Sequence, residues 1–223
     1  MILDKYTIIS NSCVGFMVFV DFYGGVHPAS ISYTNPFVSS LFLNDDEFVK
    51  FCSNYNTYMS IIPIIGEPKQ NTTWYKQTGN LRMTSPTQYP VLYPVMKLND
   101  IDIHWIHKAD VDASRILDKF NKRYELGKSL KRIFVWSAAE IFNKHDNDDR
   151  KSLINTFLSI DDQSVFLTNR KDEVFEDDKH ISVFIPEWEN KDEDDRRIDT
   201  ILKWDDQAFI SNTFRNVIEK KFS

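Results

Sequence analysis

Four polar residues that could bind or activate a substrate follow the first short apolar run of the chain. The run, residues 6–10, contains β-branched residues and predicts a strand, and an apolar segment over 14–22 predicts a helix after it. The polar residues between and at the end of these elements are Ser10, Asn11, Ser12 and Cys13. In an open α/β sheet, ligands bind where a strand ends and the N–H groups of the next helix are exposed. We therefore expect a site at this turn.

Cys13 is a candidate nucleophile, because a helix N-terminus and a nearby histidine both lower the pKa of a thiol. The alternative is a small residue packed under the helix. Ser10 and Ser12 are competing nucleophiles at the same turn.

His104 and His107 are candidate general bases, since histidine changes its charge near neutral pH. They belong to a predicted strand, 101–107, whose alternation places them on opposite faces. The alternative is a pair of hydrogen-bonded core residues.

Two cations, Lys122 and Arg123, lie on a predicted helix over 110–126. They could hold a phosphate or carboxylate, or they could form the solvated face of the helix.

Asp177 and His180 form an Asp-x-x-His spacing late in the chain. A serine after the first strand and a late Asp-x-x-His resemble the arrangement in SGNH-type hydrolases and acyltransferases, although the usual Gly-Asp-Ser block is absent. The resemblance implies that His180 takes the proton of Ser10, Ser12 or Cys13 and that Asp177 orients His180.

The composition argues against several classes of protein. With 27 Lys and Arg against 33 Asp and Glu, the net charge of −6 argues against a nucleic-acid binder. No Walker loop, GxGxxG or paired CxxC motif occurs in the sequence. The acidic clusters at 147–149 and 192–195 are interpreted as solvated loops, so no metal is predicted.

The two cysteines favour a reducing compartment, and no apolar stretch approaches the roughly 20 residues that a membrane helix needs. The N-terminal residues lack the pattern of a signal peptide. We expect a soluble cytoplasmic protein without a membrane span.

Strands and helices alternate along the chain, which predicts a three-layer α/β fold with a largely parallel open sheet and helices on both faces, Rossmann-like or SGNH-like. No domain boundary is visible, so residues 1–223 are expected to be a single α/β domain, or one domain of a longer polypeptide. Cys52 is predicted to lie in the core, on the apolar face of a helix that begins near Asn44. The other predicted elements are strands 95–98, 131–136, 164–168 and 181–185 and helices 148–160 and 204–222.

Several sequence blocks resemble a bacterial family of exopolysaccharide-biosynthesis proteins. The main blocks are Ile9–Gly15, Tyr33–Val38, Leu98–His107 and Phe120–Arg123. The sequence departs from the family pattern at Val14, Phe16 and Lys108. The resemblance implies a role in surface-glycan assembly, with Tyr33 and Asn35 contacting a sugar or nucleotide-sugar substrate.

The Asn11–Cys13 turn is also similar to the Gly-Asn-Cys turn of capsule acetyltransferases that bind coenzyme A. This similarity implies acyl transfer from acetyl-CoA to a sugar. Ser10, Asn11, Lys122 and Arg123 would then hold coenzyme A, the turn would donate N–H groups to the oxyanion, and His104 or His107 would take the acceptor's proton. The alternatives are a glycan esterase or deacetylase and a non-catalytic glycan-binding assembly protein.

Overall fold

The computed structural model describes most of the predicted strands and helices of the chain. The described residues are 6–11, 36–37, 40–42, 44–71, 91–105, 112–137, 147–168, 170–184 and 220. The helix predicted at 14–22 lies outside them, and only residue 220 of the helix predicted at 204–222 is described.

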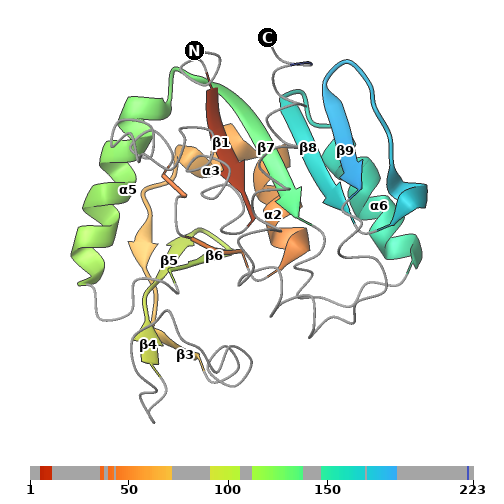
Figure 1. Cartoon of the computed structure of the whole chain (residues 1–223). Helices are drawn as coiled ribbons and strands as arrows, with labels where there is room; N and C mark the ends of the chain where they lie inside the picture. The colour runs from red at the N-terminus through yellow and green to blue at the C-terminus, as the bar shows by residue number, and fades with distance from the viewer. Residues whose placement is uncertain are drawn as a thin grey trace.

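A four-stranded parallel sheet forms the centre of the described structure and confirms the α/β prediction (Figure 1). Its strands, in spatial order, are β1 (Tyr6–Ser10), β7 (Lys131–Ser137), β8 (Gln163–Thr168) and β9 (His180–Phe184). The order runs outward from β1 in one direction, as in one half of a doubly wound sheet. The carboxyl ends of β1 and β7 therefore lie at the same edge.

Both faces of this sheet are buried, which explains why its strands read as nearly continuous apolar runs. Ile9, Phe134 and Phe166 belong to the core cluster that also contains residues of α2 (Asp45–Ser53), α3 (Tyr55–Met59) and α6 (Asn147–Leu158). On the opposite face, Val135 and Val165 are fully buried.

The strands predicted at 95–98 and from 101 onward pair as a hairpin, which belongs to a separate antiparallel sheet and does not join the parallel one. β5 (Val95–Leu98) and β6 (Ile101–His104) are joined by Asn99 and Asp100, and β2 (Ile64–Ile65) pairs with β5. A two-residue turn can only join antiparallel strands, and Asn99 adopts the positive φ of 57° that such turns favour. β3 (Lys69–Asn71) and β4 (Val91–Tyr93) pair in a third, two-stranded antiparallel sheet.

Helix α5 (Ala113–Gly127) connects the hairpin region to β7. It begins after Asp112, whose side chain accepts the Ser114 N–H, and not after Asp110 as the sequence suggested. Because three residues separate its last residue from β7, the C-terminal half of α5 lies toward the amino end of the parallel sheet (Figure 1).

Aromatic side chains pack in one core with the parallel sheet, the sheet of β2, β5 and β6, and the helices. Phe51 of α2 packs against Phe37, Phe42 and Tyr55, with ring centroids 5.1–5.4 Å apart. Cys52 is buried in the same cluster, as predicted. A short 3-10 helix, η4 (Lys171–Glu173), connects β8 to β9. None of the described helices is long and apolar enough to cross a membrane.

Candidate functional site

A buried polar network lies where β1 and β7 end. The side chain of Asn11 bridges to the backbone of Ser137: its Oδ1 accepts the Ser137 N–H at 2.9 Å, and its Nδ2 donates to the Ser137 carbonyl at 3.1 Å. Asp45 accepts the Trp136 indole N–H at 2.9 Å and lies 3.4 Å from Asn11 Nδ2. All four residues are almost fully inaccessible to solvent. We call Asn11, Asp45, Trp136 and Ser137 the edge network.

The start of α2 delivers Asp45 to this network. Asn44 caps the helix by accepting the Asp46 N–H at 2.8 Å, and Asp45 is the first helical residue. A carboxylate at a helix start is stabilised by the helix dipole. An uncompensated buried carboxylate costs several kcal/mol, and the bonds that Trp136 and Asn11 donate to Oδ1 of Asp45 offset part of this cost.

A short extended segment joins the edge network to the end of β6. The Phe42 N–H donates to the Asn11 carbonyl at 2.9 Å, and Leu41 exchanges two backbone hydrogen bonds with His104 at 2.8 and 2.9 Å. His104 is therefore fixed next to the carboxyl end of β1, although Asn11 and His104 lie 93 positions apart in the sequence.

His104 is buried, with 2% of its surface exposed, and its Nδ1 lies 3.2 Å from the Tyr93 hydroxyl. Burial, assisted by the charge of Lys69, lowers the pKa of His104 to about 4, although Asp102 opposes this change. The imidazole is accordingly neutral near pH 7. A neutral ring with so acidic a conjugate acid is a weak general base and a suitable hydrogen-bonding partner.

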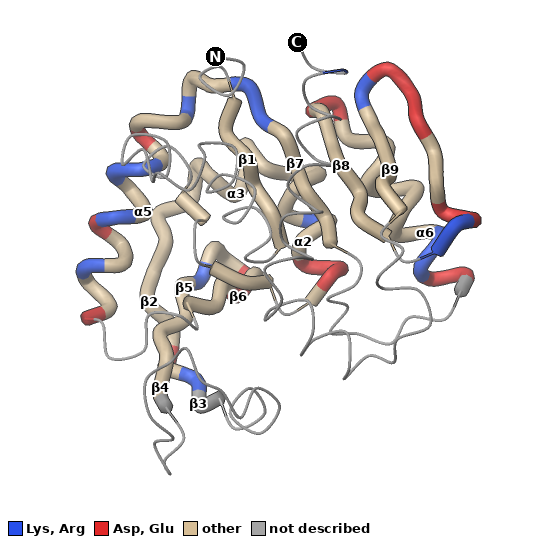
Figure 2. The backbone as a smooth tube through the Cα atoms, viewed as in Figure 1, with Lys and Arg blue, Asp and Glu red and all other residues tan. Residues whose placement is uncertain are grey.

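Charged side chains gather beside His104. Asp102, two residues earlier on the same face of β6, pairs with Lys69 at 2.9 Å and with Lys97 at 3.1 Å. Burial alone would raise the pKa of Asp102, but the hydrogen bonds from the two lysines outweigh it and lower the pKa. Lys69 belongs to β3 and Lys97 to β5, and Figure 2 shows a blue Lys or Arg segment on each of these strands.

Glu47, in the first turn of α2, faces the same cluster. Burial and the Asp102 carboxylate raise the pKa of Glu47, whereas a hydrogen bond from the Asp102 backbone and the charge of Lys69 oppose the rise. Perturbed pKa values concentrate at functional sites, and here they occur on Glu47, Tyr93, Asp102 and His104 together. We call these four residues and Lys69 the acid–base cluster. Carboxylates and an ammonium in this arrangement can bind sugar hydroxyls and accept a proton.

Two of the predicted turn residues lie at this edge. Ser10 is buried at the end of β1, and Asn11 is part of the edge network. The backbone N–H of Asn11 donates to the Val135 carbonyl, so it is not directed toward an oxyanion. Ser12, Cys13, Tyr33, Asn35 and His107 lie outside the described residues.

Lys122 and Arg123 are not brought to the same edge. Both lie in the last two turns of α5, toward the amino end of the parallel sheet. β7 rises about 20 Å from Lys131 to Ser137 at 3.3 Å per residue, which approximates the separation of the two ends. Lys122 is exposed and Arg123 is partly buried.

The predicted Ser10–His180 pairing is wrong. The two residues are on opposite edge strands of the described sheet, three strand spacings or about 14 Å apart. The Nδ1 of His180 instead lies 2.6 Å from the Ser164 hydroxyl. Asp177 accepts the backbone N–H of His180 at 2.7 Å, so it holds the turn before β9. Ser164 and His180 are both buried, which indicates a structural pair.

Sequence reasoning missed Asp45, Glu47, Tyr93 and Asp102. An acidic first turn is the ordinary signature of a helix start, so the functional interpretation of Asp45 and Glu47 required the tertiary structure. In the described part of the chain, no group of three His, Cys, Asp or Glu side chains is placed to hold a metal ion.

The fold and the site define an α/β protein with a parallel sheet and a polar, titratable site at its carboxyl edge. The chain belongs to the family described as Domain of unknown function (DUF1919), whose model matches residues 1–193. A comparison with curated protein sequences found no match.

Proposed function

We propose that the chain is an acyltransferase that modifies a sugar in surface-glycan biosynthesis, with acetyl-CoA as donor and a sugar or nucleotide-sugar as acceptor. The glycan assignment rests on the resemblance of the sequence blocks to exopolysaccharide-biosynthesis proteins, and the donor rests on the likeness of the Asn11–Cys13 turn to capsule acetyltransferases. The low cysteine content supports the cytoplasm as the place of reaction.

The observation that carries the proposal is the juxtaposition of the acid–base cluster and the edge network. Residues 40–42 connect them through backbone hydrogen bonds to Asn11 and His104. Ligands of open α/β sheets bind at this edge. A site that combines a partly buried carboxylate, a second carboxylate and a lysine suits an acceptor with several hydroxyl groups.

We propose that Glu47 is the general base that takes the proton of the acceptor hydroxyl. The acceptor oxygen bonds to the acyl carbonyl carbon, the thioester C–S bond breaks, and the proton passes through Glu47 to the leaving thiolate. The raised pKa of Glu47 makes it a stronger base than an ordinary carboxylate. His104 has a positioning role, held by Tyr93, and His107 stays a predicted alternative base.

Coenzyme A is anionic, and Lys122 and Arg123 are the cations predicted to hold it. Because they lie toward the amino end of the sheet, coenzyme A would have to be extended to reach the carboxyl edge as well. Its phosphates would lie at Lys122 and Arg123 and its thioester at the carboxyl edge. The chain's own contribution is then a cationic patch at one end and an acid–base cluster at the other. Calorimetry of acetyl-CoA with the K122A/R123A variant tests this pose, with Arg115→Ala on the same helix as the control. We expect at least about tenfold weaker binding in the double variant only.

Turnover tests the reaction itself. Purified protein is mixed with acetyl-CoA and UDP-glucose or UDP-glucosamine, and thiol release is measured. We expect turnover in the wild type, a kcat about 100-fold lower in Glu47→Gln, and little change in Asp46→Asn, which removes the neighbouring acid. Acceptor binding without thiol release would instead favour the glycan-binding alternative, and equal kcat in the two variants would rule out Glu47 as the base.

A further inference from the structure

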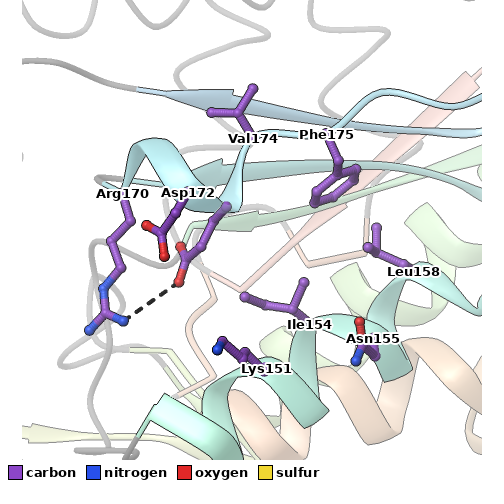
Figure 3. Close-up of a pocket in the computed structure, with 9 residues that line it drawn as sticks. Lys151, Ile154, Asn155, Leu158, Arg170, Asp172, Val174 and Phe175 are labelled. Atoms are coloured by element: carbon purple, nitrogen blue, oxygen red, sulfur yellow. Dashed lines mark ion pairs between the residues drawn. The ribbon is translucent and has the colours of Figure 1, made fainter.

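A cavity lies away from the edge network, between α6 and the connection from β8 to β9. Its volume is about 490 Å³, within the range of small-molecule sites. Four of its lining residues follow one stripe of α6, and the rest lie on or beside η4 (Figure 3). They are Lys151, Ile154, Asn155, Leu158, Arg170, Asp172, Glu173, Val174 and Phe175.

Buried contacts fix the walls of this cavity. Arg150 binds both oxygens of Glu173, at 2.5 and 2.8 Å, and the Thr168 hydroxyl donates to the same carboxylate. The side chains of Arg150 and Glu173 are only 4% and 9% exposed. Phe175 stacks on Phe166 of the core with an interplanar angle of 12°. The cavity is therefore preorganised, and a ligand would not have to order its walls.

The lining changes from charged to apolar along the cavity. Lys151 and Leu158 are seven residues apart on α6, which separates them by about 10 Å along the helix. Figure 3 shows Arg170 and Asp172 toward one end and Leu158 and Phe175 toward the other. Ile154 lies between them.

Positive charge prevails at the charged end. Arg150 binds both oxygens of Glu173, and Arg170 also pairs with this carboxylate, at 3.8 Å. Among the residues that line the cavity, together with Arg150, which binds the lining residue Glu173, three cations face two carboxylates, Asp172 and Glu173. An anionic group is thus favoured at this end, and hydrocarbon at the other.

We propose that this cavity binds a small carboxylic acid with an apolar body, its carboxylate beside Arg170 and Lys151 and its hydrocarbon against Ile154, Leu158 and Phe175. A guanidinium is well suited to a carboxylate because it offers paired N–H donors. The proposal does not depend on the acyl transfer.

Hexanoate is the probe, titrated into ¹⁵N-labelled full-length protein while backbone amide shifts are followed. We expect saturable shifts in 150–158 and 170–176, and Kd values at least about fivefold weaker for hexanamide, which lacks the charge, and for acetate, which lacks the chain. The R170Q/K151Q variant should weaken hexanoate binding by a similar factor. Lys179→Gln, on the same β8–β9 connection but outside the lining, should leave it unchanged.

Three results would overturn the proposal: hexanamide binding as tightly as hexanoate, undiminished binding in R170Q/K151Q, or shifts confined to other parts of the chain. The exposed Asn155→Trp change provides an independent check, because it fills the cavity without touching the Arg150–Glu173 pair. It should abolish the hexanoate shifts while the rest of the amide spectrum stays folded, and retained shifts would also contradict the proposal.

Discussion

His104 is held in the neutral form by burial, and this has a consequence for stability. Its pKa is about 4 in the folded chain, against 6.5 for an unperturbed histidine. Between these values the unfolded chain binds a proton that the folded chain does not. The stabilisation is therefore complete above about pH 6.5 and is lost as the pH falls toward about 4.

Urea unfolding at about pH 7.5 and about pH 5 measures this loss. We expect the wild type to lose about 2 kcal/mol more stability over this interval than His104→Gln, which cannot titrate. Equal losses in the two proteins would show that His104 does not titrate as the structure implies.

Asn11 closes the edge network through both of its polar atoms. We expect Asn11→Ala to lower the free energy of unfolding by about 3 kcal/mol, because it leaves the Ser137 N–H and carbonyl unsatisfied in the interior. Asn155→Ala, an exposed control, should change stability by less than about 0.5 kcal/mol. Chemical denaturation measures the free energy of unfolding of both variants. A loss in Asn11→Ala as small as that in Asn155→Ala would contradict a stabilising role for the edge network.

The sequence placed Asn11 directly after a strand, where the structure has it, and its role in holding coenzyme A stays a prediction. It could not identify Asp45 or Glu47, since any helix start favours acids. It also paired His180 with Ser10 wrongly, because spacing along the chain does not show which strand of the sheet a residue occupies. The Ser164 partner of His180 is set by strand register alone.

Among the elements, α6 and η4 are joined by the buried Arg150–Glu173 pair. We expect Arg150→Met to cost about 3 kcal/mol, because it leaves the buried Glu173 carboxylate with only the longer Arg170 contact and the Thr168 hydroxyl. The double variant R150M/E173Q should recover part of that stability, since no buried charge remains. A double-mutant cycle in urea measures the coupling, and additive effects would contradict a coupled pair.

The hairpin turn provides a backbone test. Asn99 has φ of 57°, which a β-branched residue adopts poorly. We expect Asn99→Val to cost about 1–2 kcal/mol and Asn99→Gly to be neutral or slightly stabilising, both measured by thermal unfolding. A destabilisation of equal size in the two variants would instead indicate a role for the Asn99 side chain.

Most described elements were predictable from local pattern. The apolar run at 131–136 predicts β7 to within one residue. The residues Asn99-Asp100 separate two apolar runs and so indicate the turn between β5 and β6. What local pattern could not show is that the hairpin forms its own sheet, because sheet membership depends on contacts between distant segments. Leu41, which pairs with β6, gave no strand signal of its own.

For the whole molecule, one core cluster contains residues of the parallel sheet, of β5 and β6 and of α2, α3, α5 and α6. A shared core predicts one cooperative unfolding transition. Phe51→Leu, at the centre of the aromatic contacts, should lower stability by about 1–2 kcal/mol and move the midpoints from far-UV circular dichroism and tryptophan fluorescence together. Separate midpoints would show that the parallel sheet and the sheet of β2, β5 and β6 unfold independently.

The central claim is that acyl transfer takes place at the carboxyl edge of the parallel sheet. Amide hydrogen exchange, measured by mass spectrometry with and without acetyl-CoA, tests it most directly. We predict that acetyl-CoA slows exchange in 40–47 and 101–105 and leaves the amino ends of β8 and β9 unchanged. Unchanged exchange in 40–47 and 101–105 at millimolar acetyl-CoA, or protection confined to the amino ends of β8 and β9, would contradict the account.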